Sequence, residues 1–263
     1  MPRPVIALLT DFGLRDHYAG TMKGVVLGVC PDAMLVDITH DVPPHDVLTG
    51  ALELAASYRY FPGGTVFLVV VDPGVGSSRR AIAAEAGDFR FVAPDNGVLS
   101  VVFEELPPKR IVELTDRRYA RPTVSRTFEG RDRFAPAAAW LAKGVALTAL
   151  GRPTAPAVKL DVPKPLLTPD AVEGVILRID RFGNLITNIE RKPVEGFLVS
   201  GGAVVLVGDL TVRVVETYAD ARAGELCALF GSTDHLELAV SGDSAATRLG
   251  LGRGAAVRIR RPA

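Results

Sequence analysis

The first part of the chain alternates short apolar runs with segments whose apolar residues recur at helical spacing. The apolar runs cover residues 5–10, 34–38 and 65–71, and helical spacing covers residues 18–29 and 47–60. Apolar runs this short predict buried strands, because a buried helix needs a longer segment. Strands that alternate with helices are typical of a mainly parallel, layered sheet, so we expect an α/β domain here. Further strands are predicted at 81–85 and 89–93, and a further helix at 134–143.

The pattern changes after residue 150. Residues 151–169 contain five prolines and little periodicity, which is typical of a linker. Short runs separated by turns then predict a small β-sandwich or barrel. These predicted strands are 173–179, 203–206, 211–215, 226–229, 235–239 and 256–259. We therefore expect an N-terminal α/β domain over 1–158, a linker over 159–170 and an all-β, barrel-like domain over 171–263.

Composition limits the classes of function. Lys and Arg together number 30 and balance 30 Asp and Glu, so no basic field favours nucleic acid or an anionic membrane surface. The chain has no apolar run of about 18 residues and no signal-peptide pattern at its N-terminus, so we expect a cytoplasmic protein. Cys30 and Cys227 lack metal or disulfide spacing and are predicted to be buried thiols. The four histidines also lack metal-ligand spacing, so we expect no metal.

Two charged residues follow the predicted strand at 65–71. Asp72 ends the strand, a turn of Pro and Gly comes next, and Arg79 follows. Ligands of open α/β sheets bind beyond the carboxyl ends of strands. Asp72 is therefore a candidate general base and Arg79 a candidate partner for it or for a substrate carboxylate. A structural ion pair that holds the turn explains the same two residues equally well.

Polar clusters also lie at the ends of other predicted elements. Asp11 follows the first strand, where it could accept hydrogen bonds from a ribose diol or serve as a turn residue. Residues 94–97 carry an Asn-Gly turn signal. In the segment that precedes the last predicted helix of this half, Glu129 could be solvated, and Asp132 is interpreted as a helix cap.

The second half of the chain has one such cluster, at residues 179–188. It forms a polar loop between two apolar runs. Phe182 could stack on a base and Asn184 could read its edge, or the two could simply belong to a β-turn.

Taken together and in order, these clusters resemble the motifs of one family. This family is the S-adenosyl-L-methionine (SAM) hydroxide adenosyltransferases, which are SAM hydrolases related to fluorinase and chlorinase. The matching segments run over nearly the whole chain in the family's order. They are Leu9-Thr10-Asp11-Phe12-Gly13 with Met22-Lys23-Gly24, Asp72-Pro73-Gly74-Val75-Gly76 with Arg79, Ala93-Pro94-Asp95-Asn96-Gly97, Thr127-Phe128-x-Gly130-Arg131-Asp132-x-Phe134-Ala135-Pro136, and Asp180-x-Phe182-Gly183-Asn184-x-x-Thr187-Asn188.

The resemblance implies a fold and a reaction. The fold would be an N-terminal α/β domain joined to a C-terminal β-barrel, assembled as a homotrimer. Each active site would lie between the N-terminal domain of one subunit and the C-terminal domain of the next. The reaction would be attack of water on the ribose C5′ of SAM, which releases L-methionine and adenosine without a metal or redox cofactor.

The resemblance also implies roles for individual residues. Asp72 and Arg79 would be two members of a water-activating triad, and Glu129 occupies the third position. The residues implied to bind SAM are Asp11 at the ribose hydroxyls, Asn184 and Phe182 at adenine, and Asp16, Asp180 and Ser232 at the amino and carboxylate groups of methionine.

Glu129 departs from the family pattern, because the hydrolases usually carry His at this position. Glu with an ordinary pKa is anionic at about pH 7 and is a weaker base than His. Glu129 substitutes as the base if burial and the nearby Asp72 raise its pKa. Otherwise activity is weakened and the chain mainly binds SAM or adenosine. We favour retained hydrolysis, because Asp72 and Arg79 are both present.

A SAM-dependent halogenase is the third interpretation. Fluorinase and chlorinase carry Tyr in the place of Asp72, and a carboxylate there would repel a halide ion. Fluorinase also has a long insertion before its counterpart of the motif at 93–97, whereas only residues 83–92 fill that place here. Hydrolysis is therefore the expected reaction.

Overall fold

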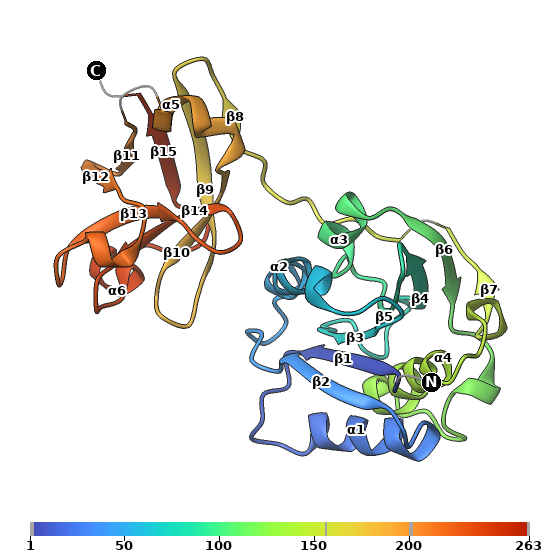
Figure 1. Ribbon diagram of the computed structural model, residues 1–263. Helices are drawn as coiled ribbons and strands as arrows, with labels where there is room; N and C mark the ends of the chain where they lie inside the picture. Colours follow the sequence, from blue (N-terminus) through green and yellow to red (C-terminus); the bar gives the residue numbers. More distant parts are fainter. Residues whose placement is uncertain (1–2, 156, 200–201, 262–263) are drawn as a thin grey trace. The chain divides into compact units, whose positions relative to one another are not determined.

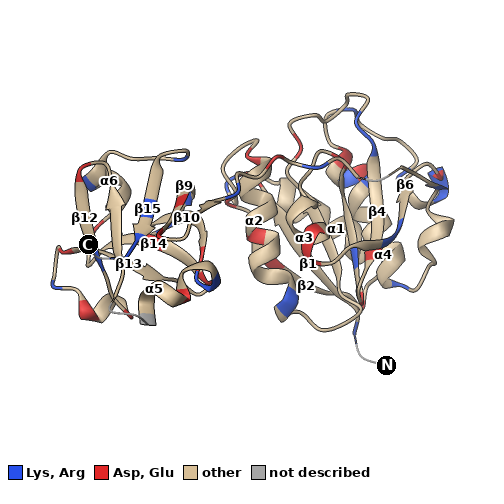
Figure 2. Ribbon diagram, turned by 90° about the horizontal axis from the view of Figure 1, so that it is seen from above, with Lys and Arg blue, Asp and Glu red and all other residues tan. Residues whose placement is uncertain are grey.

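The computed structural model describes residues 3–155, 157–199 and 202–261 (Figure 1). The chain divides into two compact units, residues 1–161 and 162–263, and each has a hydrophobic core of its own. The predicted fold class, an α/β unit followed by a β-barrel unit, is confirmed. Acidic and basic residues are interspersed in both units (Figure 2). Within the described residues, no helix is long and apolar enough to cross a membrane.

The N-terminal unit is built on a mixed sheet with the strand order β2-β1-β3-β5-β4-β6-β7. Its strands are β1 Val5–Thr10, β2 Met34–Thr39, β3 Val66–Val70, β4 Ala81–Ala86, β5 Phe89–Pro94, β6 Pro108–Glu113 and β7 Arg152–Pro153. The first four in this order pair in parallel, and the β5–β4, β4–β6 and β6–β7 pairs are antiparallel. Only Gly87 and Asp88 join β4 to β5, which is too short for the crossover that a parallel pair needs.

Helices cover both faces of this sheet (Figure 1). They are α1 Tyr18–Val29, α2 Val47–Ser57, α3 Ser100–Glu105 and α4 Ala135–Ala142, with short turns η1 Tyr58–Tyr60, η2 Arg117–Tyr119, the π-turn η3 Gly130–Phe134 and η4 Leu147–Ala149. Along β1, Ile6 and Leu8 pack in the core beneath α1 and α4, whereas Ala7 and Leu9 pack in the core beneath α2 and α3. Burial on both faces explains why β1 is an uninterrupted apolar run.

The predicted helices at 18–29 and 47–60 are present, the second as α2 with its last turn in the tighter 3₁₀ form η1. The predicted helix at 134–143 corresponds to α4, which the π-turn η3 precedes. Both cysteines are buried and unpaired, as predicted.

The strand order creates a switch point in the parallel part of the sheet. From β1 the chain leads to β2 on one side, and β3 then pairs on the other side. Open α/β sheets bind ligands at such a switch point, beyond the carboxyl ends of the strands. Asp11 follows β1 and Asp72 follows β3, so both carboxylates lie at this edge. Asn96, after β5, donates its amide to the carbonyl of Val71 over 2.8 Å and fixes the backbone beside Asp72.

The C-terminal unit is a closed seven-stranded barrel with the order β10-β14-β13-β12-β11-β15-β9, closed by the pairing of β9 with β10. A two-residue strand, β8, adds to β9. The strands are β8 Leu166–Leu167, β9 Ala171–Ile179, β10 Leu185–Glu190, β11 Val204–Val207, β12 Leu210–Val214, β13 Leu226–Phe230, β14 His235–Val240 and β15 Ala256–Arg260. Short helical segments are η5 Lys192–Val194, α5 Glu195–Val199, η6 Tyr218–Asp220 and α6 Ala245–Leu249. Closure leaves the barrel without long free edges.

Strand β10 was not expected, because its sequence contains the polar pair Thr187 and Asn188. Both side chains are buried, yet each is hydrogen-bonded to a backbone group. The Thr187 hydroxyl donates to the carbonyl of Leu236 over 2.8 Å, and the Asn188 amide donates to the carbonyl of Pro163 over 2.9 Å. Buried polar groups are tolerated when they find such partners.

Gly174 allows a close approach between β9 and β10, and it generates a prediction about stability. A Cβ atom at this position would lie 2.2 Å from Oδ1 of Asn188, which already accepts a hydrogen bond from the backbone N–H of Val175. We expect Gly174→Ala to destabilise the protein by about 1–3 kcal/mol, because Asn188 cannot move away without losing that bond. Denaturant unfolding measures the loss.

The matched control is Gly252→Ala, since a Cβ at Gly252 would meet no atom within 4 Å. Equal unfolding midpoints for the two variants would contradict the proposed close approach.

Candidate active site

Asp72, Arg79 and Glu129 form one ion-pair cluster, although Glu129 is distant from the other two in sequence. Nε of Arg79 donates to both carboxylate oxygens of Asp72, over 2.9 and 3.0 Å. Its Nη2 atom donates to Asp72 and also to Glu129. All three side chains are at most 10% exposed. The structure therefore brings together the three residues predicted to be catalytic.

One guanidinium holds both carboxylates. Burial lowers the pKa of Arg79, but the hydrogen bonds and charges of Asp72 and Glu129 raise it above its ordinary value. The group therefore stays charged. It lies over the ring of Phe134, 5.2 Å from the ring centre, which adds a cation–π contact on its apolar side.

Two glycines let the segments of this cluster approach each other. Gly76 has a φ of 76°, and a Cβ there would lie 2.4 Å from the carbonyl oxygen of Arg126. The Arg126 guanidinium in turn donates to the carbonyl of Gly76 over 3.2 Å. On the other side, a Cβ at Gly130 would lie 3.2 Å from Sδ of Met22. The first contact docks the loop after β3 against the segment that carries Glu129, and the second packs that segment against α1.

The expectation that Asp132 caps a helix is wrong. Asp132 lies inside the π-turn η3, and its fully buried carboxylate accepts a hydrogen bond from the backbone N–H of Ser125 over 2.8 Å. Arg131 pairs with it at 2.7 Å and Arg121 at 3.2 Å. Asp132 thus anchors the turn that presents Glu129. The sequence pattern of an acid before a helix fits a cap equally well, so only the fold distinguishes the two roles.

Asp11 lies at the carboxyl end of β1, partly buried. Its Oδ2 atom accepts a hydrogen bond of 2.8 Å from the backbone N–H of His45, a residue with a φ of 67°. Asp16 lies further along the same loop and is exposed. Of the two acids predicted to bind substrate from this loop, Asp11 therefore lies at the sheet edge that also carries Asp72.

In the C-terminal unit, Asp180 organises the loop between β9 and β10. Its Oδ1 atom accepts hydrogen bonds from the backbone N–H groups of Phe182 and Asn184, both 2.9 Å. Its Oδ2 atom accepts one from the Asn184 side chain over 3.0 Å. Asn184 is buried, whereas Phe182 is 77% exposed. The loop thus presents an aromatic ring to solvent beside an amide held in a fixed orientation.

Ser232 is exposed in the turn between β13 and β14. Among the described residues, no hydrogen bond joins it to the loop at 180–184. Glu237 in the same hairpin was not predicted from the sequence. It is buried and accepts a hydrogen bond from the Tyr218 hydroxyl over 2.9 Å. Burial, together with the charge of Asp180, raises the pKa of Glu237. The one sign in the sequence that could have identified Glu237 is a carboxylate within the otherwise apolar run of β14.

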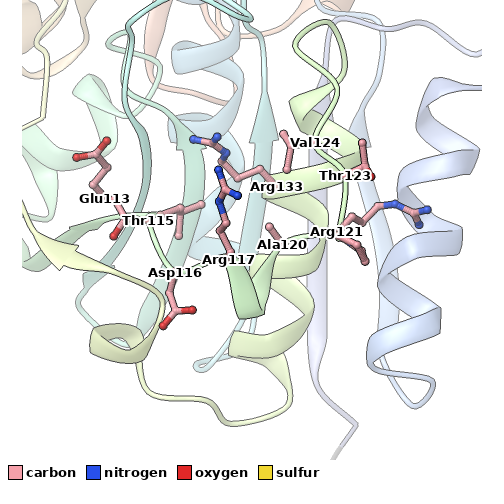
Figure 3. Close-up of a pocket in the computed structure, with 11 residues that line it drawn as sticks. Glu113, Thr115, Asp116, Arg117, Ala120, Arg121, Thr123, Val124 and Arg133 are labelled. Carbon is pink, nitrogen blue, oxygen red and sulfur yellow. The ribbon is translucent and has the colours of Figure 1, made fainter.

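A cavity of about 460 Å³ lies in the N-terminal unit, between the end of β6, η2 and the π-turn (Figure 3). It is lined by Glu113, Leu114, Thr115, Asp116, Arg117, Ala120, Arg121, Pro122, Thr123, Val124 and Arg133. None of the predicted site residues lines it. Arg133 links it to the ion-pair cluster, because Nη2 of Arg133 lies 3.4 Å from Oε1 of Glu129.

The comparisons with known proteins divide the chain in the same way as the fold does. Residues 6–151 match the model of the SAM hydroxide adenosyltransferase N-terminal domain, and residues 174–258 match the model of the corresponding C-terminal domain. The chain belongs to the SAM hydroxide adenosyltransferase family. The resemblance carried by the five ordered motifs is thereby confirmed.

Relatives within this family are similar over almost their full length. The chain is 41% identical to the (R)-S-adenosyl-L-methionine hydrolase of Thermus thermophilus, with 98% of this chain and 99% of the relative covered. It is 39% identical to the protein of the same name from Salinispora tropica, with 98% of each covered. Identity to the fluorinase of an Actinoplanes species is 31%, with 90% of each covered.

Solved structures of similar length also match. A crystal structure of a conserved protein from Thermotoga maritima matches with a TM-score of 0.92 at 38% identity, with 97% of this chain and 100% of that chain covered. A crystal structure of a conserved protein from Thermus thermophilus matches with a TM-score of 0.80 at 37% identity, with 98% of this chain and 100% of that chain covered.

The buried Asp132 predicts how stability depends on pH. Burial raises its pKa, but the hydrogen bonds from Arg131 and Ser125 outweigh this and hold the pKa below the ordinary value of 3.8. The carboxylate therefore stabilises the fold above pH 3.8, and this contribution is lost as the pH falls through the lower pKa of the folded state. We expect Asp132→Asn to be clearly less stable than the wild type at about pH 7, with the difference shrinking below about pH 4.

Denaturant unfolding at both pH values measures this difference, with the exposed Asp32→Asn as the matched control. A stability difference that stays the same at both pH values would contradict the ion-pair role of Asp132.

Proposed function

We propose that this chain hydrolyses SAM to adenosine and L-methionine by attack of water on the ribose C5′. The observation that carries the proposal is the buried cluster of Asp72, Arg79 and Glu129 beside the switch point of the sheet. Membership of the SAM hydroxide adenosyltransferase family and full-length similarity to two (R)-SAM hydrolases support it.

The reaction makes modest chemical demands that this cluster can meet. The oxygen of water bonds to C5′ while the C5′–S bond breaks, and its electron pair stays on sulfur as a neutral thioether. The leaving group therefore needs no proton, and the protein must supply a positioned water and in-line geometry. The proton lost by water passes to a carboxylate, for which Asp72 and Glu129 are the candidates held in place by Arg79.

The remaining site residues receive substrate-binding roles in this proposal. The carboxylate of Asp11 accepts hydrogen bonds from the ribose hydroxyls, and its bond to the backbone of His45 sets its orientation. Phe182 and Asn184 take the adenine ring, the first by stacking and the second through its amide. The amino and carboxylate groups of methionine are assigned to Asp16, Asp180 and Ser232.

These residues belong to both units, so a complete site requires both. Asp72, Arg79 and Glu129 lie in the unit 1–161, and the adenine-binding loop lies in the unit 162–263. We propose a homotrimer in which the N-terminal unit of one subunit meets the C-terminal unit of the next.

A SAM- or adenosine-binding protein with weak turnover is the second candidate. One observation favours it: Oε2 of Glu129 is paired with Arg79, and Oε1 lies 3.4 Å from Arg133. Both oxygens of this carboxylate therefore already face a guanidinium, which competes with water for them. Halogenation is less well supported, because the carboxylate of Asp72 would repel a halide ion in contact with it.

The direct test of hydrolysis is to incubate the purified protein with SAM in metal-free buffer and to follow adenosine and methionine by chromatography. We expect both products in equal amounts, and a loss of rate of about 100-fold or more in Asp72→Ala, because the cluster loses a carboxylate that orients or deprotonates water. The rates of adenosine release from the (R) and (S) sulfonium epimers of SAM are compared in separate reactions.

Absence of adenosine above the Asp72→Ala level would contradict hydrolysis. In that case, calorimetric binding of SAM without product would favour the second candidate. A halogenated nucleoside formed in excess chloride would favour the third.

The shared site predicts complementation between two inactive variants. Asp72→Ala damages the N-terminal unit and Asn184→Ala damages the C-terminal unit. In a mixed trimer, an intact N-terminal unit of one chain meets an intact C-terminal unit of another, so we expect co-expressed variants to regain part of the activity that each lacks alone. Activity is measured on the co-purified complex, with its mass determined by light scattering.

A site built within one chain would always contain one of the two substitutions. A mixed assembly that stays inactive would therefore exclude the shared site.

A further inference from the structure

Arg133 lies between the ion-pair cluster of Asp72, Arg79 and Glu129 and the adjoining cavity. It belongs to the π-turn η3, four residues after Glu129, and Nη2 lies 3.4 Å from Oε1 of Glu129. Its side chain also lines the cavity of about 460 Å³ and is 32% exposed there. In Figure 3 the side chains of Arg133 and Arg117 converge in this cavity from different elements. Arg133 thus reaches the one carboxylate oxygen of Glu129 that Arg79 does not hold.

The charges of the cluster show why this position matters. Asp72 and Glu129 carry two negative charges, and Arg79 supplies one positive charge to both. Without a further cation, one buried carboxylate would lack a counter-charge, which is strongly unfavourable in a protein interior. Arg133 supplies that second positive charge. A neutral His at position 129, as the hydrolases usually have, would leave the Asp72–Arg79 pair balanced by itself.

We propose that Arg133 is a positioning residue of the active site, which neutralises and orients the carboxylate that Glu129 brings beside Asp72. The proposal rests on the hydrolase function proposed above. It deepens that function, because it explains how a site with Glu in the place of His keeps two carboxylates beside one guanidinium.

The surroundings of Glu129 define what the loss of Arg133 would do. Arg79 and Asp72 face it from the loop after β3, and Arg133 faces it from its own turn. From α1 and the residue before it, Tyr18 and His17 pack against the ring of Phe128, the residue before Glu129. Removing Arg133 leaves two acids with one cation, so one buried carboxylate loses its counter-charge.

The experiment is a double-mutant cycle of Arg133→Ala and Glu129→His, measured as kcat, KM and pH profile for release of adenosine. In the Glu129 background we expect Arg133→Ala to lower kcat about 10-fold, the effect of one lost partly buried ion pair, with KM little changed. The acidic limb of the kcat profile moves to higher pH. In the Glu129→His background, Arg133→Ala changes neither kcat nor the position of the acidic limb, because the carboxylate of residue 129 is no longer there for Arg133 to balance.

Two further variants separate this role from a general loss of structure. Arg133→Lys keeps the charge and restores most of the rate. Arg117→Ala removes another guanidinium from the same cavity and leaves kcat within about twofold, because Arg117 is exposed and outside the cluster.

Chemical rescue provides a further test. Guanidinium ion, added far below denaturing concentrations, can enter the cavity and raise kcat of Arg133→Ala but not of the Arg133→Ala/Glu129→His variant.

An equal loss of kcat in both backgrounds, with no movement of the acidic limb, would overturn the proposal. Thermal unfolding of the same four proteins provides a readout that does not depend on activity. Arg133→Ala lowers the midpoint near neutral pH in the Glu129 background only. If the wild type releases no adenosine, the proposed function fails, while the thermal cycle still decides whether Arg133 stabilises the Glu129 carboxylate.

Discussion

The site depends on one guanidinium shared by two acids. Arg79 bonds Asp72 within its own loop and Glu129 from a distant segment, so a single side chain joins two parts of the chain at the edge of the sheet. Much of the nearby architecture serves this contact. Asn96 fixes the backbone before Asp72, Gly76 lets the loop meet Arg126, and Asp132 anchors the turn after Glu129. Such preorganisation lets a site act without costly rearrangement when substrate binds.

The sequence predicted those parts of the fold that local patterns determine. Strand β1 is apolar because both of its faces are buried, and the Pro- and Gly-rich turn after β3 marks a sheet edge, so Asp72 and Arg79 could be selected from the pattern alone. Strand β10 was missed because its buried Thr187 and Asn188 resemble loop residues until their backbone partners on the neighbouring strands are known.

The proximity of Glu129 to Asp72 followed only from the family motif, because no local pattern reports a contact between residues this far apart. Arg133 and Glu237 were missed for the same reason, since their significance lies in the carboxylates and hydroxyls that the fold places beside them. The domain limits at 158 and 171, the homotrimer and the cytoplasmic location stay predictions.

The balance of charge around Glu129 has a consequence for how substrate is captured. Two acids and two guanidiniums cancel, so this part of the site presents little net field to a positively charged sulfonium. In the proposed site, long-range attraction for the sulfonium therefore comes from acids outside the cluster, such as Asp11 and the exposed Asp16, and it weakens as ionic strength rises. The cluster itself acts at short range, on a water and a substrate that have already arrived.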